Sequence, residues 1–269
     1  MANQQGQASD GSAAIQVDRV EQEFVDRSGR VVRALEETSF SVPRGQFLAV
    51  IGPSGCGKTT VLNMLAGLLR PTMGSVRIHG ESVVRPRRDV GYVSARDGLL
   101  PWRATRRNVA LGLELRGMPR AERLRRADEL LSIVGLTGFE VAYRSQLSQG
   151  MRQRAAIART LAIDPQVLLM DEPFAALDAQ TKIILQQQFA KIWENDRKTV
   201  MLVTHDIEEA VLLADRVIVF SARPGRILVD QNVDLPRPRD IESLRFEPRF
   251  RDLTHELWNA LRSSIARLS

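Results

Sequence analysis

The stretch that most constrains this chain is GPSGCGKTT at residues 52–60, which follows the unbroken apolar run FLAVI at 47–51. Its glycines let the backbone turn tightly and approach an anion without side-chain collision. Successive amide N–H groups then point inward, and a helix that begins at Lys58 adds the positive end of its dipole. The stretch therefore predicts a buried strand, a phosphate-binding loop and a helix in direct succession.

The phosphate involved is predicted to belong to ATP. Lys58 can reach the β- and γ-phosphates, and the Thr59 hydroxyl can coordinate Mg²⁺. Cys56 is the only cysteine, and we interpret it as a small residue that fits the bend rather than as a redox group. The candidate ATP-binding residues of the loop are Gly52, Pro53, Ser54, Gly55, Cys56, Gly57, Lys58, Thr59 and Thr60.

Short apolar runs alternate with helical spacing along most of the chain. Strands are predicted at 47–52, 167–171, 199–205 and 216–221, and helices at 58–70 and 182–195. Strands without polar alternation are typical of a parallel sheet covered by helices on both faces. The expected fold class is therefore α/β.

Two further regions flank this core. Residues 15–25 and 31–42 predict strands joined by the turn DRSGR, as an antiparallel β-subdomain. Between about 92 and 160, strand signals are scarce, and an amphipathic helix is predicted over 119–136. We interpret that region as a helical subdomain within one domain over 15–235.

The ends of the chain differ from the core. Residues 1–14 are small and polar and are expected to form a disordered tail rather than a secretory signal. Residues 236–269 form a C-terminal extension whose amphipathic helix could pack on the body, bind a partner or lie on a membrane.

Two acidic residues end the apolar run VLLMDEP. Asp171 suits the outer coordination sphere of Mg²⁺, whereas Glu172 suits a general base that activates a water molecule. Buried carboxylates are costly without a cation, so a purely structural role is disfavoured. His205, after the run MLVT, is a candidate for contact with the γ-phosphate. Lys58, Glu172 and His205 are the candidate catalytic residues.

A second potential anion site lies at LSQGM, residues 147–151. Ser148, Gln149 and Gly150 precede a helix rich in Arg and Ala, and a helix N-terminus favours anions. One nucleotide cannot occupy two such sites in one chain. The pattern thus predicts a head-to-tail dimer in which this segment contacts the ATP of the opposite subunit.

Charge and composition limit the partners and the compartment. The chain carries 38 Lys and Arg against 32 Asp and Glu, a formal net charge of +6, which suits nucleotides, nucleic acids or acidic lipids without choosing among them. A single cysteine excludes an intrachain disulfide, and no apolar stretch reaches the roughly 18 residues that span a bilayer. We expect a cytoplasmic protein.

Taken in order, GPSGCGKT, LSQGM, VLLMDEP, ALD and TH closely resemble the motifs of the ATP-binding subunits of ATP-binding cassette (ABC) transporters. The resemblance covers roughly residues 15–235 and implies a P-loop NTPase core with an antiparallel β-subdomain and a helical subdomain. It also implies that Asp178 lies in a loop that connects the two ATP sites. Phe24 becomes the candidate that stacks on adenine, the alternative being an ordinary core residue.

Several stretches, including LLPWRATRRNVALGLELRG and DEPFAALDAQTK, resemble the nitrate, sulfonate and taurine importers. This implies an ATPase that powers import through dimer closure, with integral membrane permease subunits and, indirectly, a periplasmic solute-binding protein as partners. The implied location is the cytoplasmic face of the bacterial inner membrane, as a peripheral subunit. The implied groove for the permease includes GLLPWRA, with Trp102 either lining it or buried in the helical subdomain.

The chain departs from the family pattern at two positions. Ala95 stands where a glutamine usually contacts Mg²⁺ and the attacking water, and Gln149 replaces a glycine. Either hydrolysis persists with altered coupling to the permease, or the chain is a weakly or non-hydrolysing regulatory subunit that pairs with another ATPase. The first interpretation is favoured because Glu172 is retained.

Other classes of this superfamily fit less well. A DNA-repair or chromosome-organising ATPase would need a long coiled-coil or zinc insertion, and only about sixty residues of helical insertion are present. A translation factor would need two cassettes in one chain. We therefore expect no nucleic-acid partner.

Overall fold

The computed structural model describes residues 13–265. Most of the tail predicted at 1–14, and the last four residues, lie outside this range. Ala13 and Ala14, which the sequence assigned to the tail, lie inside it and belong to a strand, and Ala14 is fully buried. The folded chain thus begins earlier than predicted.

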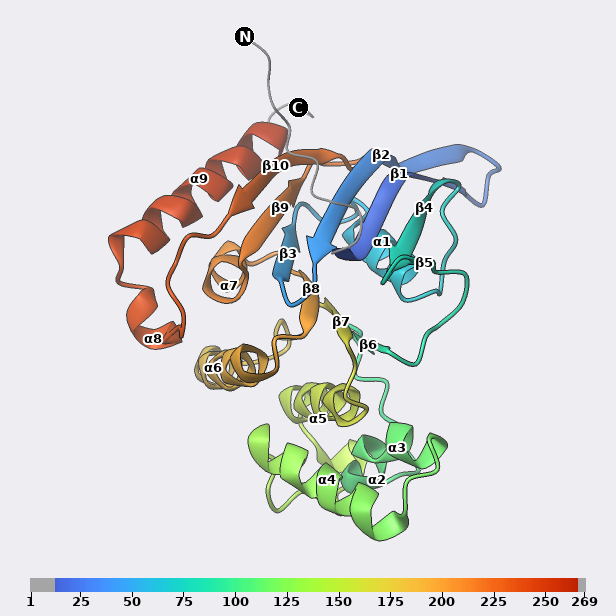
Figure 1. The fold of residues 1–269 in the computed structure, drawn as a ribbon, viewed down its shortest axis with the longest axis vertical. Helices are drawn as coiled ribbons and strands as arrows, with labels where there is room; N and C mark the ends of the chain where they lie inside the picture. Colours follow the sequence, from blue (N-terminus) through green and yellow to red (C-terminus); the bar gives the residue numbers. More distant parts are fainter. Residues whose placement is uncertain (1–12, 266–269) are drawn as a thin grey trace.

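A six-stranded sheet forms the centre of the molecule (Figure 1). In spatial order its strands are β10 (Ile227–Asn232), β9 (Arg216–Phe220), β3 (Phe47–Ile51), β8 (Thr199–Val203), β7 (Val167–Asp171) and β6 (Val90–Val93). All neighbours are parallel except β10, which pairs antiparallel with β9. The four predicted strands are confirmed. The two that sequence patterns missed, β6 and β10, are short or half-exposed strands at the sheet edges.

A second sheet of four antiparallel strands confirms the predicted β-subdomain. Its spatial order is β2 (Val31–Pro43), β1 (Ala13–Val25), β4 (Met73–Ile78) and β5 (Glu81–Ser82). Strand β3 is apolar throughout because its side chains, which point alternately to the two faces of the sheet, are buried on both faces. Leu48 and Val50 join a core with the β-subdomain, whereas Phe47, Ala49 and Ile51 join the core on the other face.

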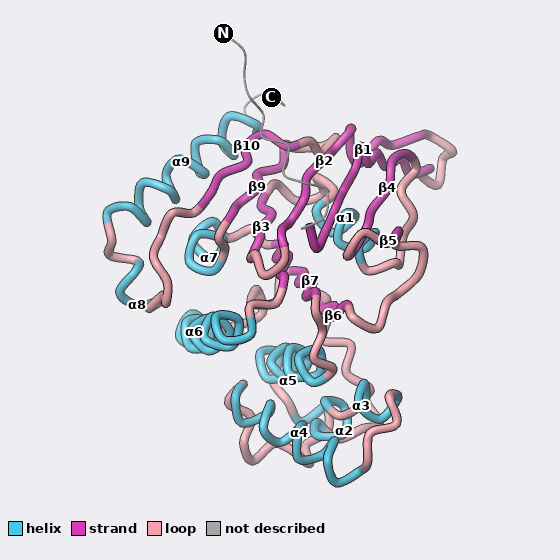
Figure 2. Tube along the Cα trace, in the orientation of Figure 1, coloured by secondary structure: helices cyan, strands magenta, loops and turns pink. Residues whose placement is uncertain are grey.

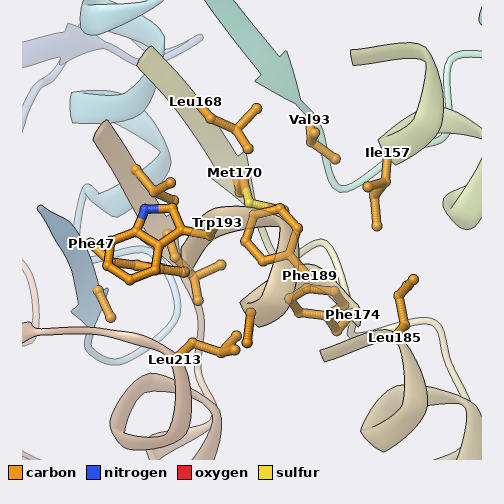
Figure 3. Packing of buried hydrophobic residues seen from close by; sticks show 14 of the residues in the cluster. Phe47, Val93, Ile157, Leu168, Met170, Phe174, Leu185, Phe189, Trp193 and Leu213 are labelled. Carbon is orange, nitrogen blue, oxygen red and sulfur yellow. The ribbon is translucent and has the colours of Figure 1, made fainter. Parts of the chain in front are cut away.

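Helices that pack on the central sheet include α1 (Lys58–Leu65), α6 (Ala179–Asp196) and α7 (Ile207–Leu213). Aromatic packing joins α6 to the sheet (Figure 3). The ring of Phe47 lies edge-on to Phe189 at 6.0 Å and to Trp193 at 5.5 Å between ring centroids. Such contacts fix α6, and with it the residues that precede its first turn, relative to β3.

The helical subdomain lies at one end of the molecule, where Figure 2 shows helices and loops and no strand. It comprises α2 (Thr105–Val109), α3 (Leu111–Leu115), α4 (Arg120–Ile133), the 3₁₀ turn η1 (Arg144–Gln146) and α5 (Gln149–Ala162). The prediction of a helix over 119–136 is confirmed by α4. Trp102 is 71% exposed, so the alternative that it is buried in this subdomain is wrong.

The C-terminal extension contains α8 (Ile241–Leu244) and α9 (Pro248–Ile265). Among the residues of α9 whose burial is described, those that are buried against the body, beside α7, β9 and β10, are Phe250, Leu253, Leu257 and Leu261. Of the three interpretations of this amphipathic helix, packing on the body is therefore the one that the fold supports. Among the described residues, none of the helices combines the length and apolar character that a bilayer span requires.

Candidate functional site

The glycine-rich loop connects β3 to α1, as its sequence predicted. Gly57 caps α1 with a positive φ of 94°, and a Cβ there would lie 2.4 Å from Cδ2 of Leu35. Only glycine meets both demands without strain. The buried Lys58 ammonium donates to the carbonyl oxygens of Gly52 (2.7 Å) and Pro53 (2.9 Å). Its charge is therefore held within the loop.

Thr59 and Asp171 bring the two halves of the site together. The Thr59 hydroxyl lies 3.0 and 3.1 Å from the two carboxylate oxygens of Asp171, which ends β7. Burial, with a smaller contribution from Glu172, raises the pKa of Asp171, although the Thr59 hydrogen bond and Lys58 oppose the shift. A buried carboxylate beside a hydroxyl fits a divalent cation, because a cation would offset the desolvation of the charge.

The residues around Asp171 would supply only part of a metal coordination shell. No group of three or more His, Cys, Asp or Glu residues that could hold a metal ion occurs in the described part of the chain. Mg²⁺ commonly binds through one or two protein oxygens together with substrate phosphates and water. The site therefore fits a metal that arrives with a phosphate ligand.

Glu172 and His205 lie next to each other at the ends of adjacent strands. Nδ1 of His205 is 3.3 Å from Oε1 of Glu172, and the two side chains are 62% and 34% exposed. Glu172 has a φ of 48°, which is strained for a residue with a side chain, and its amide donates to Val203 O at 2.9 Å. Strained backbone that the surrounding sheet enforces is frequent at functional sites.

A pocket of about 320 Å³ lies over the loop, and we call it the phosphate-loop pocket. Its lining residues are Phe24, Ala34, Ser54, Gly55, Gly57, Lys58, Thr59, Thr60, Glu172 and Arg223. Phe24 is 43% exposed, so its alternative as an ordinary core residue is wrong. Arg223 was not found by sequence reasoning, because no motif marks it and it lies 168 positions from Gly55.

Ser148, Gln149 and Gly150 do not belong to the lining of that pocket. Ser148 caps α5 and accepts a hydrogen bond from the Met151 amide at 3.2 Å. A Cβ on Gly150 would lie 3.1 Å from Cδ2 of Leu177, which places this segment beside the loop that ends at Asp178. Within one chain the structure thus keeps residues 148–150 apart from the lining of the phosphate-loop pocket.

The two departures from the family pattern share one hollow. Ala95 and Gln149 both line a pocket of about 480 Å³ between α5 and the segment 94–101, and both residues are exposed. Gln153 donates to Ser94 O at 3.2 Å, and Arg159 donates to Gly98 O at 2.7 Å. Side chains of α5 therefore hold the segment at one position before Ala95 and one after it.

Asp97 also anchors that segment. Its carboxylate accepts hydrogen bonds from the Leu99 amide (2.9 Å) and from Arg144 (2.9 and 3.0 Å), and Arg152 lies 3.5 Å away. Burial acts to raise the pKa of Asp97, but these partners outweigh it and hold the pKa below its ordinary value. Sequence reasoning missed this residue.

Asp178 and His205 are connected through a charged cluster that sequence reasoning also missed. Asp178 caps α6 by accepting from the Thr181 amide at 3.0 Å. One residue further on, Lys182 contacts Asp206 at 2.7 Å and Glu209 at 2.8 Å. Asp206 directly follows His205, so α6 is tied to the turn that carries the histidine. A basic residue four positions after Asp178 is the only sequence signal for this pairing.

Comparison with known proteins identifies the class. The family described as ABC transporter matches residues 35–175, which is over half of the chain. This chain belongs to that family, and it is an ATP hydrolase of the ATP-binding cassette type. The predicted P-loop NTPase fold with its β- and helical subdomains is confirmed. A dimeric cassette solved in a post-hydrolysis state with ADP and Pi superposes with a TM-score of 0.76 at 32% identity, over 82% of this chain and 100% of that one.

Relatives narrow the assignment within the family. An uncharacterized ABC transporter ATP-binding protein of Methanocaldococcus jannaschii is 53% identical over 81% of this chain and 82% of its own length. The taurine import ATP-binding protein of Rhizobium johnstonii is 43% identical over 93% and 97%, and the nitrate import ATP-binding protein of Synechocystis is 42% identical over 89% and 91%. The chain is an ATP-binding subunit of the nitrate/sulfonate/taurine branch.

Proposed function

We propose that this chain hydrolyses ATP to power an importer of a small anionic or organic solute of the nitrate, sulfonate or taurine type. The observation that carries the proposal is the contact of Thr59 with Asp171 at the carboxyl end of β7. It unites the phosphate loop with the acidic strand end, and Glu172 and His205 lie beside it. Each part of a phosphoryl-transfer site is then supplied by one short segment.

In the proposed reaction, the loop amides and Lys58 hold the β- and γ-phosphates, and Phe24 stacks on the adenine. Glu172 accepts the proton of a water molecule whose oxygen attacks the γ-phosphorus. The bond from that phosphorus to the bridging oxygen breaks, and that oxygen leaves with ADP. His205 contacts the γ-phosphate while the charge on that phosphate changes. The side-chain exposure of Glu172 and His205 leaves both accessible to the nucleotide.

Thr59 and Asp171 would hold Mg²⁺ in this site. When bound, the metal would neutralise part of the charge on the phosphate chain. Burial raises the pKa of Asp171 and so disfavours its charged form. A nearby dication would favour the ionised carboxylate, so the buried position supports this assignment.

The signature residues support a head-to-tail dimer. Ser148, Gln149 and Gly150 lie outside the phosphate-loop pocket of their own chain, and we infer that they contact the ATP of the opposite subunit. Leu177 lies next to Gly150, and Asp178 follows Leu177 in the chain. Asp178 would then connect the two ATP sites. The solved cassette to which this chain is similar is also a dimer.

The permease surface is proposed on the helical subdomain. Trp102 borders two hollows there, of about 470 and 410 Å³, which also share Arg107, Arg120 and Leu124. An exposed tryptophan amid basic residues is suited to bind a short cytoplasmic helix of the membrane subunit. The chain would thus act as a peripheral subunit on the cytoplasmic face of the bacterial inner membrane, while a periplasmic solute-binding protein delivers the solute.

Steady-state ATP hydrolysis with and without Mg²⁺ tests the proposal, with Glu172→Gln as the control and Ala95→Gln alongside. We expect Mg²⁺-dependent turnover that Glu172→Gln reduces by roughly 10²-fold or more while ATP binding remains. A faster rate in Ala95→Gln would show that Ala95 slows hydrolysis. Turnover no higher than in Glu172→Gln, with ATP still bound, would contradict the proposal and favour a regulatory subunit.

A further inference from the structure

The loop between β9 and β10, residues 221–226, is held rigidly against the phosphate loop. The Gly225 amide donates to Ala34 O at 2.9 Å, and Gly225 O accepts from the Glu36 amide at 2.9 Å. A Cβ on Gly225 would lie only 1.9 Å from the carbonyl oxygen of Cys56. The two loop backbones therefore meet without an intervening side chain, and their relative position is fixed.

Hydrogen bonds within this loop add to its rigidity. The Ser221 hydroxyl donates to Pro224 O at 3.0 Å and accepts from the Arg226 amide at 3.0 Å, and the Ser221 amide donates to Arg226 O at 2.9 Å. Ser221 is buried. Because the loop closes on itself and on β2, the backbone of Arg223 is set before any ligand arrives.

Arg223 projects from this loop into the phosphate-loop pocket. Its Nε donates to Gly55 O at 3.2 Å, and its Nη2 lies 3.4 Å from the position that a Cβ on Gly55 would take. It lines the same pocket as Phe24 and Lys58. A second cation is thus placed over the loop, and it comes from a segment that no nucleotide-binding motif includes.

Within residues 13–265 the guanidinium of Arg223 has no carboxylate within ion-pair distance. A guanidinium carries five N–H donors in a planar fork that matches phosphate oxygens. One of these donors meets Gly55 O, and the exposed remainder faces the pocket. Arg226, three residues later, differs in both respects, since it lies 3.9 Å from Glu36 and does not line the pocket.

We propose that Arg223 is a nucleotide-binding residue that donates to the phosphate chain shared by ATP and ADP. This inference rests on the proposed ATP site and adds a contact to it. The position beside Gly55, in the middle of the loop, places the guanidinium at the phosphates rather than beyond them. Its contact strengthens nucleotide binding and leaves the hydrolytic groups Glu172 and His205 untouched.

Equilibrium titration of the full chain with the fluorescent N-methylanthraniloyl derivative of ADP, followed by competition with ATP, ADP and AMP, tests this. Arg223→Ala is expected to raise the dissociation constants for ATP and ADP by roughly five- to fifty-fold, because a charge-assisted hydrogen bond is lost. The dissociation constant for AMP should rise much less. Arg223→Lys should fall between wild type and Arg223→Ala.

Arg226→Ala is the matched control, since it removes the same charge from the same loop. Thermal melts of both variants establish that each is folded. The proposal is overturned if Arg223→Ala binds ATP and ADP as tightly as wild type, or if Arg226→Ala weakens the binding of ATP and ADP equally. It is also overturned if Arg223→Ala lowers the affinity for AMP as much as the affinity for ADP. If the wild-type chain bound no nucleotide at all, the proposed function itself would fail, and the two failures are therefore distinguishable.

Discussion

The Nζ atom of Lys182 lies 2.8 Å from Oε2 of Glu209, whose side chain is 2% exposed. Lys182 is the first-turn residue of α6 that also contacts Asp206, directly after His205. Burial raises the pKa of Glu209, and Lys182 opposes that shift. The ammonium therefore compensates a buried carboxylate at the joint between α6 and the histidine turn.

Lys182→Ala is expected to lower the free energy of unfolding by roughly 3 kcal/mol, because it leaves a buried charge without its partner. Urea denaturation followed by circular dichroism measures the change. Lys191→Ala, an exposed lysine on the same helix, should change stability by less than about 0.5 kcal/mol. Equal effects of the two substitutions would mean that the ion pairs with Asp206 and Glu209 do not stabilise the fold.

His205→Ala should separate activity from stability. The imidazole is mostly exposed, so its loss should shift the melting temperature by no more than about 2 °C. ATP hydrolysis should fall roughly 10²-fold if the ring contacts the γ-phosphate. His255→Ala, an exposed histidine on α9, serves as the control and should leave the rate unchanged. A His205→Ala enzyme of wild-type rate would remove the histidine from the site.

Asp97 predicts a specific dependence of stability on pH. Its pKa in the folded chain lies below the ordinary value of 3.8, so its contribution is present above pH 3.8 and disappears as the pH falls through the lower folded pKa. Asp97→Asn should cost roughly 1–2 kcal/mol of unfolding free energy at pH 7. The difference from wild type should therefore shrink as the pH falls below 3.8.

Urea titrations of wild type and Asp97→Asn at several pH values measure this dependence. Asp252→Asn, at an exposed position of α9, provides the reference for an exposed carboxylate. A difference between wild type and Asp97→Asn that stayed constant with pH would show that the side chain acts through its shape rather than through its charge.

The thiol of Cys56 should be unreactive in the folded protein. It is fully buried, and burial raises its pKa although Lys58 acts in the opposite direction. Because the thiolate is the reactive form, we expect labelling by Ellman's reagent to be at least about 10²-fold slower than in guanidinium, where one thiol per chain should react. Rapid labelling of the native protein would contradict a purely space-filling role for this residue.

Much of the fold could be predicted because its signals are local. The apolar runs of β3, β7, β8 and β9 and the glycine loop each occupy a few consecutive residues. Edge strands such as β6 and β10 are short or half-exposed, so their patterns are weak. Asp171 and Glu172 could likewise be assigned because a charged pair at the end of a buried strand is locally unusual.

The sequence by itself determined the class of protein, the phosphate loop and the acidic strand end, since backbone conformation and charge at each of these depend on neighbours in the chain. Only the tertiary structure decided that Thr59 meets Asp171, that Ser148 and Gly150 stay away from their own phosphate loop, and that Arg223 reaches Gly55 across 168 positions. The reason is physical. A parallel sheet collects the carboxyl ends of strands that are distant in the chain, and which side chains meet there depends on strand order and loop packing, which no local pattern records.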